Sequence, residues 1–123
     1  MVRKRVEGGI SEKTFSERVV EIARAIPKGR VMTYGLIARY AGGGAMAAQS
    51  VTSILGRAYD NGTRDIPFHR IVYADGRIWA SDGRERRERM RKYRAEGIEL
   101  DARDRIVCFA EVLFDPNPSS TLS

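Results

Sequence analysis

The residues from which covalent and metal-based sites are built are scarce in this chain. Its 123 residues include one cysteine, Cys108, and one histidine, His69. A lone cysteine excludes an internal disulfide and a cysteine-based metal cluster, which suits a reducing compartment. We therefore expect a cytoplasmic protein that binds no metal.

Long hydrophobic runs are absent too. No apolar stretch approaches the roughly 20 residues that a membrane-spanning helix needs, so we expect no membrane crossing. The first residues, MVRKRVEGGISEK, are basic and lack the apolar stretch and cleavage site of a secretion signal. We predict a flexible basic arm at residues 1–12, one folded domain at residues 13–114 and a disordered polar tail at residues 115–123.

Positive charge exceeds negative charge. The chain carries 22 lysines and arginines against 16 acidic residues, a formal net charge of +6, which favours nucleic acid or another anionic surface as a partner. Much of this charge lies in RERRERMRKYR, residues 84–94, which would form about three helical turns. A solvated helix face, softened by Glu/Arg pairs four residues apart, would explain the same segment.

Helical periodicity is clearest near the start of the domain. Apolar residues at helical spacing predict a helix over residues 11–26, and they are Phe15, Val19, Ile22, Ala23 and Ile26. Ser11 or Thr14 could cap its start, and Pro27 with Gly29 would end it.

A short helix, a glycine-rich turn and a longer helix are predicted next. Residues 29–33 have the β-branched character of a short extended stretch, and Thr33 is placed to cap a helix over residues 34–40. After the turn AGGGAM, residues 45–60 predict a helix with four inward residues, Val51, Ile54, Leu55 and Ala58. The arrangement is typical of a DNA-binding helix-turn-helix, although an ordinary helical hairpin would give the same pattern.

The C-terminal half combines a turn signal with a charged helix. In RIVYADGRIW, apolar residues alternate around an Asp-Gly pair, which predicts a β-hairpin. A charged helix should run from residue 82 to 96 and close at Gly97, followed by a short β excursion and an apolar segment. The predicted fold class is α/β and mostly helical, a winged-helix-like helix-turn-helix domain with a short β-hairpin.

Three blocks of sequence resemble a known family in content and in order. They are IPKGRVMTYGLIARYAG, IPFHRIVYADGRI and YRAEGIEL, within a similarity that runs from Phe15 to Leu100. The chain is similar to the C-terminal domain of the O6-alkylguanine-DNA alkyltransferases, and more closely to the alkyltransferase-like proteins. In the active repair enzymes the second block reads Pro-Cys-His-Arg, and its cysteine takes the alkyl group from a flipped guanine. Phe68 stands at that position here.

The resemblance implies a protein without enzymatic activity. Displacement of an alkyl group from guanine O6 needs a thiolate or an equivalent nucleophile, and phenylalanine supplies none. His69 and Glu96 match the family positions that would deprotonate the cysteine, so we expect His69 to be structural. Cys108 could be proposed as a substitute nucleophile, but its apolar surroundings in the sequence favour an inert buried thiol.

The resemblance also assigns roles to individual residues. The expected lesion pocket comprises Tyr34, Phe68, His69, Arg70, Trp79, Ser81 and Glu96. The expected DNA-binding residues are Thr33, Tyr34, Arg39, Ala48, Gln49, Ser50 and Arg57. Tyr34 matches a tyrosine that promotes nucleotide rotation, and Gln49 stands where the family places an arginine finger, which predicts weaker binding. Tyr34 and Trp79 could instead be core aromatics.

The function implied is recognition of O6-alkylguanine in double-stranded DNA. The protein would bind the minor groove, flip the lesion and flag it for nucleotide excision repair, acting as a monomer without a cofactor. Repair proteins of that pathway would then be partners. The alternative is a general or sequence-specific DNA-binding regulator without lesion recognition.

Overall fold

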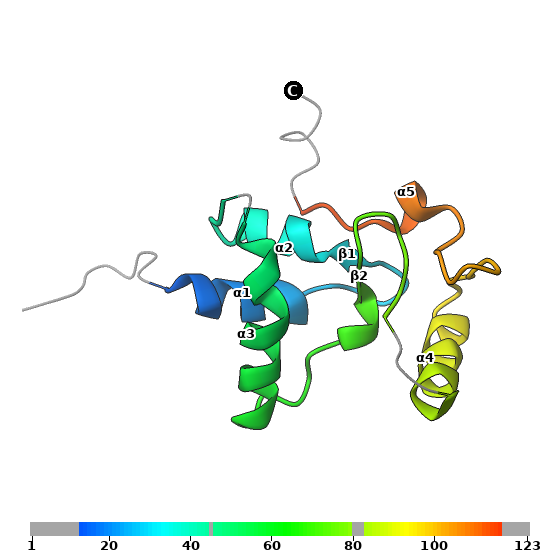
Figure 1. The fold of residues 1–123 in the computed structure, drawn as a ribbon, viewed down its shortest axis with the longest axis horizontal. Helices are drawn as coiled ribbons and strands as arrows, with labels where there is room; N and C mark the ends of the chain where they lie inside the picture. Colours follow the sequence, from blue (N-terminus) through cyan, green and yellow to red (C-terminus); the bar gives the residue numbers. More distant parts are fainter. Residues whose placement is uncertain (1–12, 45, 80–82, 117–123) are drawn as a thin grey trace, which may run out of the picture.

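The computed structural model describes residues 13–44, 46–79 and 83–116. A bundle of three helices forms one side of the molecule, α4 forms the other, and a small parallel sheet lies between them (Figure 1). The elements in chain order are α1 (Phe15–Arg24), β1 (Met32–Thr33), α2 (Tyr34–Tyr40), α3 (Ala48–Asp60), the 3-10 turn η1 (Phe68–Arg70), β2 (Ile71–Val72), α4 (Gly83–Ala95) and α5 (Phe109–Val112). The predicted arm at residues 1–12, Ser81 and residues 117–123 lie outside the described residues, and the proposed domain limits stay a prediction.

Helix α1 begins where its capping residues dictate. The Thr14 hydroxyl accepts a hydrogen bond from the Glu17 amide at 3.1 Å, and the Glu17 carboxylate accepts one from the Thr14 amide at 2.9 Å. This reciprocal pair satisfies two amides that have no partner within the helix. The helix ends at Arg24, two residues earlier than predicted, while Ile26 beyond it is still buried in the core.

The helix-turn-helix is formed by α2 and α3. Thr33 caps α2 as predicted, since its hydroxyl accepts a hydrogen bond from the Leu36 amide at 3.0 Å. Helix α3 starts at Ala48, three residues later than predicted, and buries Val51, Ile54 and Leu55 against α1 and α2. Its Ala58 is half-buried.

The turn between α2 and α3 is closely packed at Gly43. Its amide donates to the Ala38 carbonyl at 2.8 Å, and a Cβ added here would lie 2.5 Å from the Ala47 Cβ and 2.8 Å from a ring carbon of Phe15. We expect Gly43→Ala to lower the free energy of unfolding by about 2 kcal/mol through overpacking. Chemical denaturation would measure the loss. The control is Gly44→Ala, whose Cβ would meet nothing within 4 Å; equal stability of the two variants would contradict the prediction.

The predicted β-hairpin is wrong, although its turn forms. The Gly76 amide donates to the Tyr73 carbonyl at 2.9 Å, but β2 pairs in parallel with β1, with Met32 opposite Ile71. After the turn the chain pairs elsewhere, and the Ile78 amide donates to the Asp104 carbonyl at 3.0 Å. Both residues of β2 are buried, whereas a two-stranded hairpin would leave one of its faces to solvent.

A second, smaller core lies beneath α4. It contains Val31, Val72, Ile78, Tyr93, Ile98 and Ile106. Helix α4 ends at Ala95, one residue earlier than predicted. Gly97 closes it as expected with a φ of 78°, while the Ile98 amide donates to the Tyr93 carbonyl at 2.9 Å. The sheet joins the two cores, because Met32 of β1 and Ile71 of β2 belong to the first and Val72 of β2 belongs to the second.

Two kinds of site are missing from the part of the chain that the structure describes. None of its helices is long and apolar enough to cross a membrane. It also contains no cluster of three or more histidine, cysteine or acidic side chains suited to a metal ion.

Candidate nucleic-acid interface

Four hydrogen-bond donors converge on the carboxylate of Glu96, which lies at the C-terminal end of α4. His69 Nε2 is 2.7 Å from Glu96 Oε2, and Arg70 Nη2 is 2.8 Å from the same oxygen. Arg70 Nε also reaches the carboxylate, and the Gly29 amide donates to Oε1 at 2.9 Å. Arg70 Nη1 also donates a hydrogen bond to the Ile26 carbonyl at 2.9 Å. The network therefore joins η1, α4 and the loop after α1.

The charges in this network follow from its burial. Burial raises the pKa of Glu96, but hydrogen bonds from Arg70, Gly29 and His69 outweigh it and lower the pKa to about 2. Burial lowers the pKa of His69 and outweighs the opposing effect of Glu96. At neutral pH the imidazole is neutral, and it must donate its Nε2 proton because an ionised carboxylate can only accept. Tyr93 donates its hydroxyl hydrogen to the His69 carbonyl, which holds the residue from its other side.

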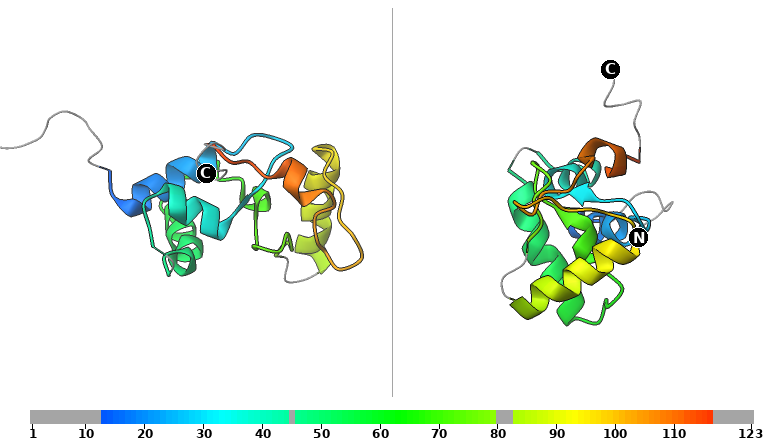
Figure 2. Two further views of the ribbon diagram at one scale, coloured as in Figure 1. Left: turned by 90° about the horizontal axis from the view of Figure 1, so that it is seen from above. Right: turned by 90° about the vertical axis from the view of Figure 1, so that its right-hand side faces the viewer.

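Phe68 lies beside this network at the wall of a cavity of about 490 Å³. In Figures 1 and 2, η1 lies between α3 and α4. The cavity is lined by residues of α3, η1 and α4 and of the loop between α3 and η1. Its lining residues are Tyr59, Arg64, Ile66, Phe68, His69, Glu85, Glu88, Arg89 and Lys92. The Phe68 ring meets Tyr59 edge to face with 5.8 Å between centroids, and the Arg64 guanidinium stacks over Tyr59 at 4.3 Å. The cavity thus has an aromatic wall and a charged rim.

Five of the seven predicted pocket residues fall into three groups. Phe68 and His69 line the cavity, whereas Arg70 and Glu96 stand behind it in the hydrogen-bond network. Tyr34, at the start of α2, is half-buried and packs against Tyr73 with 5.6 Å between ring centroids. The pKa of Tyr34 is raised, and burial is the main cause.

Trp79 is not a core residue, because 43% of it is exposed. It lies outside the cavity, and the Arg89 guanidinium stands 5.5 Å from the centre of its ring. The core interpretation of Trp79 is therefore wrong. Ser81, the last of the predicted pocket residues, lies outside the described residues.

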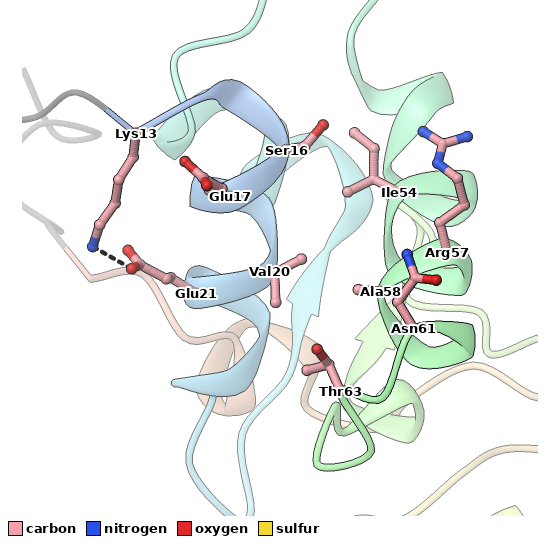
Figure 3. A pocket seen from close by; sticks show the side chains of 10 residues that line it. All are labelled: Lys13, Ser16, Glu17, Val20, Glu21, Ile54, Arg57, Ala58, Asn61 and Thr63. Atoms are coloured by element: carbon pink, nitrogen blue, oxygen red, sulfur yellow. Dashed lines mark hydrogen bonds and ion pairs between the residues drawn. The ribbon is translucent and has the colours of Figure 1, made fainter.

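The predicted DNA-binding residues all lie in α2 and α3 or, for Thr33, directly before α2. Thr33 caps α2, Arg39 and Gln49 are exposed, and Ala48 and Ser50 are half-buried at the start of α3. Arg57 lies apart from them on the side of α3 that faces α1. It lines a groove of about 480 Å³ there together with Val20 and Ile54 (Figure 3). Met46, next to Gln49 and 70% exposed, was not predicted as part of this surface.

The basic segment at residues 84–94 forms α4 and pairs only part of its charge within the described chain. An ion pair joins Glu85 and Arg89 at 3.8 Å, four residues apart, and Arg86 pairs with Asp104. Arg87 and Arg91 are exposed. One face of α4 is therefore exposed to solvent, as the Glu/Arg spacing suggested. Arg89 lies on another face and lines the cavity.

Seven residues that line the cavity were not predicted from the sequence: Tyr59, Arg64, Ile66, Glu85, Glu88, Arg89 and Lys92. A signal existed for Arg89, because it lies four residues before the buried Tyr93 and so shares its helix face. No comparable signal marks Tyr59, in the last turn of α3, or Arg64, in the loop that follows this helix.

Cys108 was predicted to be buried and is exposed. It precedes α5 with a left-handed backbone φ of 56°, and this turn directs the chain rather than burying its side chain. Cys108 does not line the cavity beside Phe68.

Comparisons with known proteins agree with one another. A family model for the DNA-binding domain of 6-O-methylguanine DNA methyltransferase matches residues 14–98. A curated DNA base-flipping protein of Escherichia coli K12 is 35% identical over 95 residues, which cover 77% of this chain and 70% of that protein. A DNA base-flipping protein of Vibrio parahaemolyticus is 34% identical over 89 residues, which cover 70% of this chain and 82% of that protein.

Solved structures of related proteins include complexes with DNA. S. pombe Atl1 in complex with damaged DNA containing O6-carboxymethylguanine matches with a TM-score of 0.63 and 26% identity, covering 83% of this chain and 95% of that one. A complex of S. pombe ATL with DNA matches with a TM-score of 0.65 and 25% identity, over the same shares of the two chains.

Proposed function

This chain belongs to the family of the 6-O-methylguanine DNA methyltransferase DNA-binding domain, as an alkyltransferase-like protein, and from that premise we propose that it recognises O6-alkylguanine in DNA without repairing it. It binds double-stranded DNA through α2 and α3, flips the alkylated base and holds it beside Phe68. The observation that carries the proposal is that Phe68 lines a cavity and adjoins an intact His69–Glu96 pair. The resemblance of the PFHR block to the family assigns the position of the acceptor cysteine to Phe68.

The residues beside the cavity support binding rather than chemistry. Alkyl transfer needs a nucleophile at the alkyl carbon, and the aromatic ring of Phe68 has none. His69 is neutral and hydrogen-bonded to Glu96, which suits a fixed wall of the pocket. Cys108 is outside the cavity and is not positioned to replace the missing nucleophile. We therefore expect no alkyl transfer to the protein, and an increase in protein mass after incubation with alkylated DNA would contradict this part of the proposal.

Lesion preference arises from both the DNA and the pocket. Extrusion of a base costs a few kcal/mol, and this cost falls when alkylation of O6 has already weakened the pairing with cytosine. The exposed or half-buried residues at the start of α3, including Gln49 and Ser50, are small or uncharged and can approach the minor groove closely. Exposed arginines such as Arg39 supply phosphate contacts, which make the affinity fall with salt.

The test is fluorescence anisotropy with two labelled duplexes that differ by one O6-methylguanine, measured at two salt concentrations. Preference for the lesion that persists at the higher salt supports the proposal. Equal and strongly salt-dependent binding would favour a general DNA-binding regulator instead. Delivery of the lesion to nucleotide excision repair belongs to the same proposal and would be tested by co-binding of purified repair proteins to the lesion complex.

Gln49→Arg is expected to tighten binding to the lesion duplex by about 1 kcal/mol, or roughly fivefold. Gln49 is exposed at the first turn of α3, where a guanidinium would add a charge-assisted contact in the groove. Titration of labelled duplex would measure the change. The matched control is Ser53→Arg, which adds the same charge at an exposed position one turn further along α3; an equal gain in both variants would show that Gln49 does not enter the groove.

A further inference from the structure

Arg89 is the least satisfied polar side chain near the cavity. Its side chain is 15% exposed, and it lines the cavity together with Phe68. Within the described residues its buried Nε has no hydrogen-bond partner. Its Nη2 lies 3.8 Å from a Glu85 carboxylate oxygen, which is longer than a hydrogen bond. A guanidinium in this position has lost water without gaining a full set of acceptors.

The contacts of Arg89 hold its guanidinium at the cavity wall. It stands 5.5 Å from the Trp79 ring centre and forms a hydrogen bond with the Tyr93 hydroxyl, so its orientation is constrained. The other charged side chains that line the cavity are Arg64, Lys92, Glu85 and Glu88. With Arg89 included, cations outnumber carboxylates by three to two in this set. An additional carboxylate would therefore enter a region with an excess of positive charge.

We propose that Arg89 makes the cavity selective for O6-alkyl groups that end in a carboxylate. This inference rests on the proposed function, because it needs a flipped O6-alkylguanine beside Phe68. The alkyl carbons pack on the Phe68 ring, and the terminal carboxylate accepts hydrogen bonds from the Arg89 guanidinium. A methyl adduct brings no acceptor to Arg89.

The energetic reason lies in the geometry of the guanidinium. An arginine fork can donate two parallel hydrogen bonds to one carboxylate, and such charge-assisted bonds are stronger than neutral ones. The loose contact with Glu85 competes little, because its 3.8 Å separation exceeds that of a direct hydrogen bond. The cavity of about 490 Å³ has room for a substituent larger than methyl. Selectivity for charge should therefore exceed selectivity for size.

The experiment compares three duplexes, which carry O6-methylguanine, O6-carboxymethylguanine or its neutral isostere O6-carbamoylmethylguanine. Wild-type protein is expected to bind the carboxymethyl duplex roughly tenfold more tightly than the carbamoylmethyl duplex. Arg89→Met, which keeps the length of the side chain, should remove this ratio, so that the carboxymethyl and carbamoylmethyl duplexes bind equally. The matched control is Arg91→Met, the same exchange at an exposed position of α4, and it should leave the ratio unchanged.

Two results would overturn the inference. One is equal binding of the carboxymethyl and carbamoylmethyl duplexes by wild-type protein. The other is an unchanged ratio in Arg89→Met, with circular dichroism confirming that the variant is folded. Failure of the proposed function has a different signature, because no alkylated duplex would then bind more tightly than the duplex with guanine.

Discussion

Phe68→Ala is expected to weaken binding to a duplex with O6-methylguanine by about 2 kcal/mol, or roughly thirtyfold, and to leave binding to undamaged DNA almost unchanged. The ring of Phe68 is half-buried, held edge to face by Tyr59, and forms part of the cavity wall. Its removal takes away the surface on which the flipped base and its alkyl group would pack, while the exposed residues of α2 and α3 that are proposed to contact the DNA backbone are unchanged. Anisotropy with paired lesion and guanine duplexes would measure both affinities.

Phe68→Trp is the matched control for this prediction. It retains an aromatic wall and should therefore retain most of the lesion preference. Because Phe68 also packs against the first core, thermal unfolding must show that the alanine variant is folded at the temperature of the assay. An alanine variant that is folded and still prefers the lesion as strongly as the wild type would place the flipped base elsewhere.

Glu96→Gln is expected to lower the free energy of unfolding at pH 7 by about 3 kcal/mol. Glutamine has a similar shape, but it leaves the mostly buried guanidinium of Arg70 without a compensating charge and removes an acceptor from His69. Urea denaturation would measure the loss. The control is Glu99→Gln, an exposed carboxylate three residues away, which should change stability by less than about 0.5 kcal/mol. A similar small effect at Glu96 would mean that the network adds no net stability.

The lowered pKa of Glu96 makes the stability of the protein depend on pH. The pKa of Glu96 is lowered from 4.5 to about 2, so its stabilisation is complete above pH 4.5 and is lost as the pH falls toward 2. The lowered pKa of His69 acts in the same direction, since stability is lost as the pH falls below 6.5 and the unfolded chain takes up its proton. Glu96→Gln should flatten the loss between pH 4.5 and 2, and an unchanged acid profile would assign that loss to other carboxylates.

Local features were predicted correctly where short-range chemistry decides them. Thr14 and Thr33 cap their helices because each hydroxyl reaches an amide three residues ahead, and Gly97 ends α4 because it accepts a positive φ. The pairing of His69 with Glu96 was expected from the resemblance to a family. Its donors Gly29 and Arg70 were not expected to share the same carboxylate, because that convergence needs three distant segments to meet.

The sequence alone was sufficient for helices α1 to α4, the residues Thr14, Thr33 and Gly97 at their ends, the helix-turn-helix, the family and the absence of a nucleophile at residue 68, whereas α5 was not predicted. These depend on periodicity, on contacts within a few residues and on which side chain occupies a motif. The tertiary structure decided that β2 pairs with β1, that Cys108 is exposed, and that Arg64 and Arg89 share a cavity with Phe68. Such outcomes depend on which buried surfaces meet across the chain, and side-chain burial is gained only when distant segments pack together.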